Sequence, residues 1–244
     1  FRAPNAQESL LIGDVGDWYN APNKGLGPER ADTFELMTRF DAWRLYGSAA
    51  GYLTLVSDII KRVPSTWQGQ TEIDGNLVVE NANGGDARLF GAEATLGARL
   101  GCGLSLEGAL TWTRGDELLD AAAQAADAEG RGSIPLSKIP PLFGRATLRW
   151  SGAISASTTA FAETYLLWAT KQDRLSDGDK RDVRIPEGGT PGWVTWNLRG
   201  GVSFHDHLRV TLTIENLTDT AYKYHVSGFA MPGTNALLAL DLSI

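Results

Sequence analysis

Two short runs of histidine and aspartate carry side chains of the kind that bind metal ions. The first is HDH at 205–207, which falls where a two-residue turn is expected and has no evident third ligand. The second is SDGDKRD at 176–182, whose carboxylates are Asp177, Asp179 and Asp182. This run lacks the glycine position and the distal glutamate of a calcium-binding loop. We therefore interpret the first run as a turn and the second as a solvated loop, and we expect no metal site.

Groups for acid–base or nucleophilic catalysis are not evident either. Paired carboxylates need a defined spacing, and the candidate glutamates lie on different predicted strands. These glutamates are Glu35, Glu93, Glu107 and Glu163. The chain has one cysteine, Cys102, which we place in a turn, and no Ser–His–Asp or Cys–His arrangement can be built. We therefore expect no catalytic residue, no enzyme activity and no cofactor.

The composition narrows the possible partners. The chain has 244 residues, of which 43% are hydrophobic, and a formal net charge of −7. A negative charge argues against nucleic acid as a partner. No apolar run reaches the roughly 18 residues that a membrane-spanning helix needs. Strands of a membrane barrel alternate polar and apolar residues and leave no hydropathy peak, so a membrane location remains open.

Period-two alternation predicts nine strands in one domain. They cover residues 31–43, 48–61, 77–100, 103–115, 142–150, 153–171, 192–204, 207–217 and 234–244. Short connections are expected at 100–103, 151–152 and 205–206, and long loops at 116–141, 172–191 and 218–233. The only helical signal is ELLDAAAQAADAEG at 117–130, inside a long loop. Short turns at one end and long loops at the other are typical of an outer-membrane barrel.

The stretch LRVTLTIE at 208–215 illustrates the two faces of these strands. Its apolar residues Leu208, Val210, Leu212 and Ile214 alternate with Arg209, Thr211, Thr213 and Glu215. The mid-strand charges of the other strands also fall on the polar face, as expected if a charge against lipid costs ~2–4 kcal/mol. Tryptophans near strand ends fit an interfacial girdle, namely Trp43, Trp112, Trp150, Trp168 and Trp193. We predict an all-β, antiparallel transmembrane β-barrel with a wet lumen; a soluble sheet with one buried face is the alternative.

The strand count predicts that this barrel is larger than the chain. Nine is odd, whereas bacterial barrels of this kind have an even number of strands. The last predicted strand follows a long loop and therefore ends at the periplasmic rim, which puts the first residues outside. We expect residues 1–244 to form the carboxy-terminal part of a single barrel domain.

Five segments, in order along the chain, resemble signatures of TonB-dependent outer-membrane receptors. They are FRAPNAQE with GLGPERADTFELM, NANGGDARLFGAEATL, IPLSKIPPLFGRATLRW, IENLTDTAYKYH, and PGTN with the last strand. Two positions depart from the family pattern. Ile244 ends the chain where the family usually has an aromatic residue, and Thr234 stands where the family has an arginine.

The resemblance implies a barrel of about 22 strands, of which these nine are the last. It also implies an amino-terminal plug and the remaining strands as intramolecular partners, contact with outer-membrane lipid, and energy from a TonB complex. The implied location is the bacterial outer membrane, and the implied function is uptake of a scarce solute such as a ferric siderophore, haem or cobalamin.

Aromatic residues of the predicted outer loops are the candidate ligand-binding residues: Trp18, Tyr19, Tyr222, Tyr224 and His225. Aromatic rings with a few polar groups suit a flat chelate, although Trp18 and Tyr19 could simply pack their loop. Haem receptors of the family that the chain resembles carry a histidine in the span matching residues 1–26, and here that span has none. We therefore expect a metal chelate, with a ferric siderophore preferred. Haem or cobalamin uptake, a passive pore and an outer-membrane enzyme are the alternatives.

Overall fold

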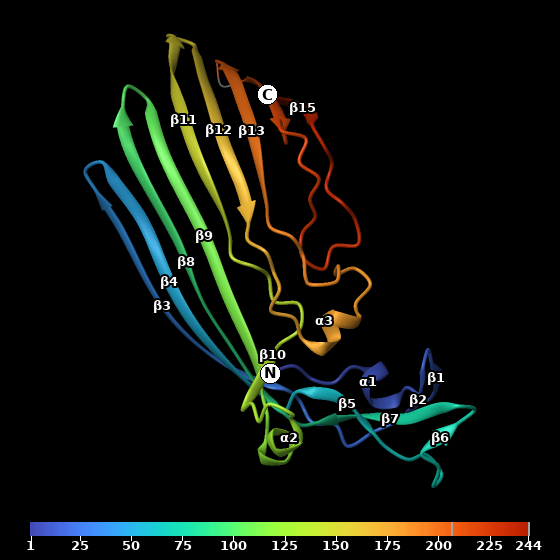
Figure 1. Cartoon of the computed structure of the whole chain (residues 1–244). Helices are drawn as coiled ribbons and strands as arrows, with labels where there is room; N and C mark the ends of the chain where they lie inside the picture. Colours follow the sequence, from blue (N-terminus) through green and yellow to red (C-terminus); the bar gives the residue numbers. More distant parts are fainter. Residues whose placement is uncertain (206, 244) are drawn as a thin grey trace. The chain divides into compact units, whose positions relative to one another are not determined.

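The computed structural model describes residues 1–205 and 207–243 and divides into two compact units (Figure 1). The first comprises Phe1–Phe34, Leu53–Leu89 and Gly115–Leu136, and the second comprises Glu35–Tyr52, Phe90–Arg114 and Ser137–Ile244. Asp206 of the HDH run and the terminal Ile244 lie outside the described residues.

Nine long strands form one sheet and follow one another in chain order. They are β3 (Arg30–Ala42), β4 (Leu45–Ser57), β8 (Asp86–Gly101), β9 (Leu104–Leu118), β11 (Phe143–Ser155), β12 (Thr158–Ala169), β13 (Trp193–Phe204), β14 (Leu208–Glu215) and β15 (Asn235–Leu242). The registers from β9 to β15 are antiparallel. The predicted all-β antiparallel meander is confirmed.

A second, smaller sheet in the first unit was not predicted. It contains β1 (Gly13–Val15), β2 (Trp18–Ala21), β5 (Ile60–Pro64), β6 (Glu72–Ile73) and β7 (Asn76–Asn83). The predicted strand 77–100 is therefore wrong, because it joins β7 of this sheet to β8 of the long sheet. Gly84 and Gly85 separate the two strands, and Gly85 has a φ of +94° that breaks the extended run.

The predicted strand 48–61 is wrong for the same reason. β4 ends at Ser57, Asp58 has a φ of +58°, and Ile60 already belongs to β5 of the small sheet.

Two further predictions about local structure need correction. Ser151 and Gly152 are not a turn, because they pair with Phe161 and Ala160 inside the ladder, and the turn falls at 156–157. The predicted helix 117–130 is shortened to α2 (Ala121–Ala126). Its first residues extend β9 instead, where they pair with β10 (Ser133–Pro135).

The remaining helices are α1 (Ala6–Leu10) and α3 (Asp177–Arg181). Across the described residues, no helix has the length and apolar character needed to cross a membrane. Cys102 lies in the short β8–β9 connection with a φ of +52°, which confirms its predicted place in a turn. In the second unit, β11 to β15 run between short turns at one end and long loops at the other (Figure 1). We call these the short-turn end and the long-loop end.

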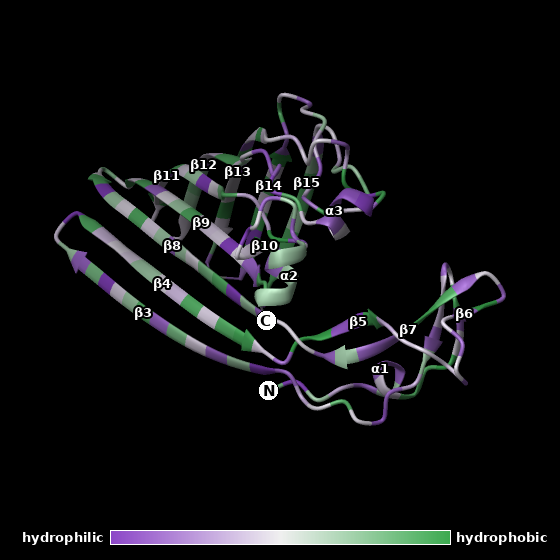
Figure 2. Ribbon diagram, turned by 60° about the horizontal axis from the view of Figure 1, so that its bottom comes forward, coloured by the Kyte–Doolittle hydropathy of each residue, from purple (hydrophilic) through white to green (hydrophobic). Residues whose placement is uncertain are grey.

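The long strands have one apolar and one polar face. Leu212 and Leu238 are register partners on the apolar face, with 47% and 67% of their surfaces exposed. On the opposite face, Arg149, Glu163 and Arg199 form one cross-strand row. Figure 2 shows the resulting alternation of hydrophobic and hydrophilic residues along the strands. The predicted segregation of charge to one face is confirmed.

Each unit has a small core. Val78 and Asn20 are almost fully buried in the first unit, and Tyr165, Thr195 and Asn197 are buried in the second. A sheet that exposes leucine along one whole face buries little apolar surface of its own. The polar face therefore contains much of the specific packing, and it also positions the candidate site.

Candidate functional site

Trp18 and Tyr19 belong to the first unit and lie on a strand, not in a loop. They start β2, which runs parallel to β7, and they pair with Leu77 and Val78. Arg62 stacks over the Trp18 ring, with its Cζ atom 5.3 Å from the ring centroid. Trp18 keeps 38% of its surface exposed, so its ring is both packed and accessible.

Tyr222, Tyr224 and His225 belong to the second unit, in the long loop between β14 and β15. Both tyrosines contact Trp193, the first residue of β13: ring centroids are 4.3 Å apart for Trp193 and Tyr222 and 5.2 Å apart for Trp193 and Tyr224. The predicted girdle position of Trp193 is wrong, because it lies in phase with Thr195 and Asn197 on the polar face. That phase was visible in the sequence and could have identified Trp193 as a site residue.

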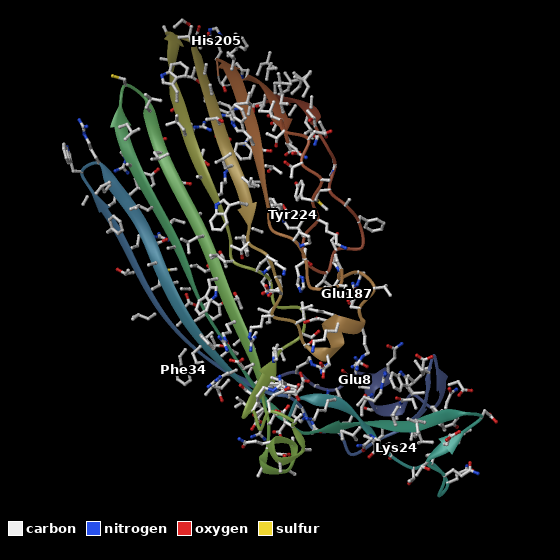
Figure 3. The ribbon with its side chains drawn as sticks, viewed as in Figure 1. Glu8, Lys24, Phe34, Glu187, His205 and Tyr224 are labelled. Atoms are coloured by element: carbon white, nitrogen blue, oxygen red, sulfur yellow. The ribbon has the colours of Figure 1, made fainter. Side chains whose placement is uncertain are left out.

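The rings of Trp193 and Tyr224 border a pocket of about 260 Å³ in the second unit. Its lining includes Phe143, Arg145, Leu167, Trp193 and Tyr224. Figure 3 shows Tyr224 beside β13, toward the long-loop end. The pocket therefore combines aromatic and aliphatic walls with one guanidinium group, and of its lining residues the sequence identified only Tyr224.

Arg145 is held in place by its neighbours. Its Cζ lies 4.1 Å from the centroid of the Tyr165 ring, and Nη2 donates to Glu163 Oε1 at 3.3 Å. Arg149 donates to the other oxygen of Glu163 at 2.8 Å, and only 5% of the Glu163 side chain is exposed. Each carboxylate oxygen of Glu163 therefore accepts a hydrogen bond from an arginine, and the carboxylate holds both guanidinium groups in place.

His225 is anchored inside its loop. Its Nδ1 lies 2.9 Å from the hydroxyl of Thr190, and its Nε2 is buried without a hydrogen-bond partner among the described residues. Burial lowers the pKa of His225 below the ordinary histidine value, with an opposing contribution from Asp179 and Asp182. The imidazole is therefore held neutral and faces protein on both nitrogens.

The sequence signature NLTD with PGTN forms a clasp at the base of this loop. Asn216, which is 2% exposed, donates through Nδ2 to the carbonyl oxygens of Thr220 and Pro232 at 2.9 and 3.2 Å. Thr234, at the position where the resemblance expects arginine, donates through Oγ1 to the Asn216 carbonyl oxygen at 2.8 Å. Its backbone N–H donates to the Asp219 carboxylate at 3.0 Å. The signature thus fixes the loop that carries the tyrosines.

The interpretation of SDGDKRD as a solvated loop is wrong for Asp179, because this residue is only 1% exposed. It caps α3 with Ser176 and accepts hydrogen bonds from the Ser137 hydroxyl at 2.7 Å and the Lys138 N–H at 3.0 Å. Burial alone raises the pKa of Asp179, but these hydrogen bonds outweigh it and lower the pKa. Asp179 therefore ties the β12–β13 loop to the segment before β11.

The first sequence signature is also a structural tie, within the first unit. Arg2 and Glu29 exchange both backbone hydrogen bonds at 2.9 Å, and Arg2 Nε donates to the Glu29 carboxylate at 2.6 Å. The second oxygen of Glu29 accepts from the Ile60 N–H at 2.8 Å. FRAPN and GPER, far apart in sequence, are thereby joined.

Among the described residues, no group of three or more histidine, cysteine, aspartate or glutamate side chains is arranged to hold a metal ion. Figure 3 shows His205 at the short-turn end, whereas His225 belongs to the long loop after β14. Glu107 accepts a hydrogen bond from the Tyr46 hydroxyl at 3.2 Å.

Comparison with known proteins identifies the fold. The family model described as TonB dependent receptor-like, beta-barrel matches residues 1–217. The copper transporter OprC superposes with a TM-score of 0.71 at 18% identity, over 99% of this chain and 36% of that protein. A mutant of the ferric enterobactin receptor PfeA from Pseudomonas aeruginosa has a TM-score of 0.63 at 17% identity, over 98% of this chain and 36% of that one.

The ferric-catecholate import receptor Fiu from K12 E. coli has a TM-score of 0.57 at 19% identity, over 96% of this chain and 30% of that one. The chain thus spans about a third of the length of these structures. No curated protein gives a significant match to its sequence. Because the family model covers most of the 244 residues, the chain belongs to the TonB-dependent receptor β-barrel family.

Proposed function

We propose that this chain forms the carboxy-terminal part of the barrel domain of an outer-membrane receptor that imports a metal chelate by TonB-coupled transport. Family membership supports the receptor, and the exposed leucine face of the long strands supports contact with membrane lipid. The partners in this proposal are an amino-terminal plug, the remaining barrel strands and the TonB complex.

The preferred solute is a ferric siderophore, and the observation that carries this choice is the aromatic pocket of the second unit. Trp193 and Tyr224 provide flat walls, and Arg145 provides a positive charge beside them. Aromatic faces and a guanidinium group bind a flat, negatively charged chelate through stacking and charge-assisted hydrogen bonds. A metal already wrapped by its carrier needs no protein ligand, which fits the lack of a metal-binding cluster among the described residues.

Haem is a weaker candidate because of the position of His225. Its Nδ1 is engaged by Thr190 and its Nε2 is buried, so neither nitrogen is exposed to a haem iron. Trp18 and Tyr19 remain proposed ligand contacts in the first unit, where the Trp18 ring keeps an exposed face. Replacing both with alanine in the whole receptor should weaken chelate binding; unchanged affinity would assign them to packing alone.

The test combines growth and binding. A strain that depends on this receptor for iron should grow on purified siderophores and not on haem as the single iron source. Trp193→Ala with Tyr224→Ala should weaken chelate binding by about tenfold or more, since each ring contributes roughly 0.5–1.5 kcal/mol through stacking. Trp43→Ala is the matched control, because Trp43 is 86% exposed in the short β3–β4 turn.

All variants should retain the heat-modifiable gel mobility of a folded barrel. Growth on haem alone, or equal binding by the double variant and the native receptor, would contradict the proposed solute and site.

A further inference from the structure

A second hollow lies on the polar face of the second unit, near the short-turn end. It encloses about 560 Å³. Its polar lining consists of three arginines and four hydroxyl residues: Arg149, Arg199, Arg209, Ser151, Thr159, Ser203 and Thr211. None of its lining residues is acidic. We call it the arginine hollow.

Register and a glycine create this hollow. Ser151, Phe161, Gly201 and Thr211 form one cross-strand row. A Cβ atom on Gly201 would lie 2.6 Å from the Phe161 ring, so the glycine leaves the space that the ring occupies against β13. Arg199 lies two residues before this glycine on the same strand. The row that contains Gly201 therefore forms a depression in the polar face, and the guanidinium group of Arg199 lies beside it.

The Phe161 ring positions two of the arginines. The Cζ atoms of Arg149 and Arg199 lie 4.1 and 5.7 Å from its centroid. Cation–π stacking orients a guanidinium group and leaves its N–H edge free to donate. Arg209, on β14, donates through Nε to the Ser203 hydroxyl at 3.0 Å. This hydrogen bond does not use the two terminal nitrogens of the guanidinium group.

The charge in the hollow is only partly compensated. Glu163 neutralises Arg149, at 2.8 Å, and it is shared with Arg145. Glu163 and Asp241 are the cross-strand register partners of Arg199 and Arg209. Among the described residues, however, neither arginine forms an ion pair with a carboxylate: Arg199 contacts the Phe161 ring and Arg209 donates to Ser203. Two guanidinium groups beside several hydroxyls form a donor set that matches an oxyanion, which accepts from both types of group.

We propose that the arginine hollow binds an oxyanion group, a carboxylate or phosphate, of a small anionic solute. The hollow and the aromatic pocket share no lining residue, and Arg199 lies six positions after Trp193 on β13, roughly 20 Å along the strand, so the two sites are distinct. If the chain works as proposed above, this solute is the imported chelate, and the hollow is a second binding station on its route. Binding of an oxyanion itself does not depend on that function.

The test uses tungstate as an electron-dense oxyanion and the purified whole receptor. Calorimetric titration should show tungstate binding, and anomalous scattering from soaked crystals should place it beside Arg199 and Arg209. Arg199→Gln and Arg209→Gln should each weaken binding roughly tenfold, since each removes a charge-assisted hydrogen bond. Arg199→Lys should bind with intermediate affinity, because it keeps the charge and loses the fork.

Arg39→Gln is the matched control. Arg39 lies on β3, outside the lining of the hollow, so its loss should leave tungstate affinity unchanged. No tungstate binding to the native receptor, or equal affinities for native, Arg199→Gln and Arg209→Gln proteins, would overturn the proposal. A protein carboxylate filling the hollow would produce the first of these results.

The growth assay separates this inference from the proposed function. Tungstate binding without uptake of any chelate would reject the transport proposal and leave the hollow standing. Siderophore-dependent growth without tungstate binding would reject the hollow alone.

Discussion

Replacing Leu238 with arginine tests which face of the long sheet meets the membrane. Leu238 is 67% exposed and pairs with Leu212 on the apolar face. Its neighbour Leu237 is 51% exposed and pairs with Thr213, which lies on the polar face. The two residues have the same type, occupy adjacent positions and point to opposite faces, so Leu237→Arg is a matched control.

The position of Leu238 along its strand sets the size of the effect. Leu238 lies five positions before Ser243, which corresponds to about 16 Å along the strand and roughly 12 Å along the membrane normal at a tilt of about 40°. The apolar band of a bacterial barrel is about 25 Å tall, so Leu238 lies near its middle. Arginine there costs ~2–4 kcal/mol, whereas arginine at position 237 faces the wet lumen and should cost less than about 1 kcal/mol.

The measurement is equilibrium unfolding in guanidinium of the whole receptor refolded into phospholipid vesicles, followed by tryptophan fluorescence. We expect the free energy of unfolding to fall by ~2–4 kcal/mol for Leu238→Arg and to change little for Leu237→Arg. Equal losses in both variants, or a larger loss for Leu237→Arg, would refute the assignment of the leucine face to lipid.

Three other changes test local features of the second unit. Gly97→Ala should destabilise the sheet by ~1–3 kcal/mol in the same unfolding assay, because the added Cβ would overlap the Tyr46 ring. Gly51→Ala is the control and should cost far less, because the nearest atom to its Cβ would be 3.9 Å away. Asp179→Asn should speed proteolysis of its loop at pH 7. Folding lowers the pKa of Asp179, so the native loop should keep its protease resistance at neutral pH. It should lose that resistance only as the pH falls below the ordinary aspartate value of about 3.9. Burial also lowers the pKa of His225, so the local stability of its loop should fall as the pH drops below about 6.5 toward the folded value. Amide protection factors in the loop, corrected for the intrinsic pH dependence of exchange, should decrease over that range, and His225→Phe should remove the decrease.

The sequence by itself determined the class of the fold and the chemistry of its two faces. Alternation such as that at 208–215 is a local property, because successive residues of any extended strand point to opposite sides. This alternation predicted the long strands, the long loops at one end of them and the segregation of charge to one face. The motifs led to the same family that the comparison identified.

Alternation could not show where a strand changes sheet. Residues 76–101 continue the pattern through Gly84 and Gly85, yet the chain leaves the small sheet there and enters the long one. The hydrogen-bond partners of a strand lie in distant segments, so its sheet is decided by tertiary pairing. The same reason applies to Ser151 and Gly152, which resemble a turn and are held in the ladder by Phe161 and Ala160.

Only the tertiary structure decided which side chains make a site. Trp193 and Tyr222 belong to different segments, and their rings meet because the loop after β14 folds back over the start of β13. The arginine hollow likewise exists because the registers of four strands bring Arg149, Arg199 and Arg209 around one depression. A sequence specifies the type of each side chain and the face on which it lies, whereas a binding site requires distances between residues on different strands, and these are fixed by register and loop packing.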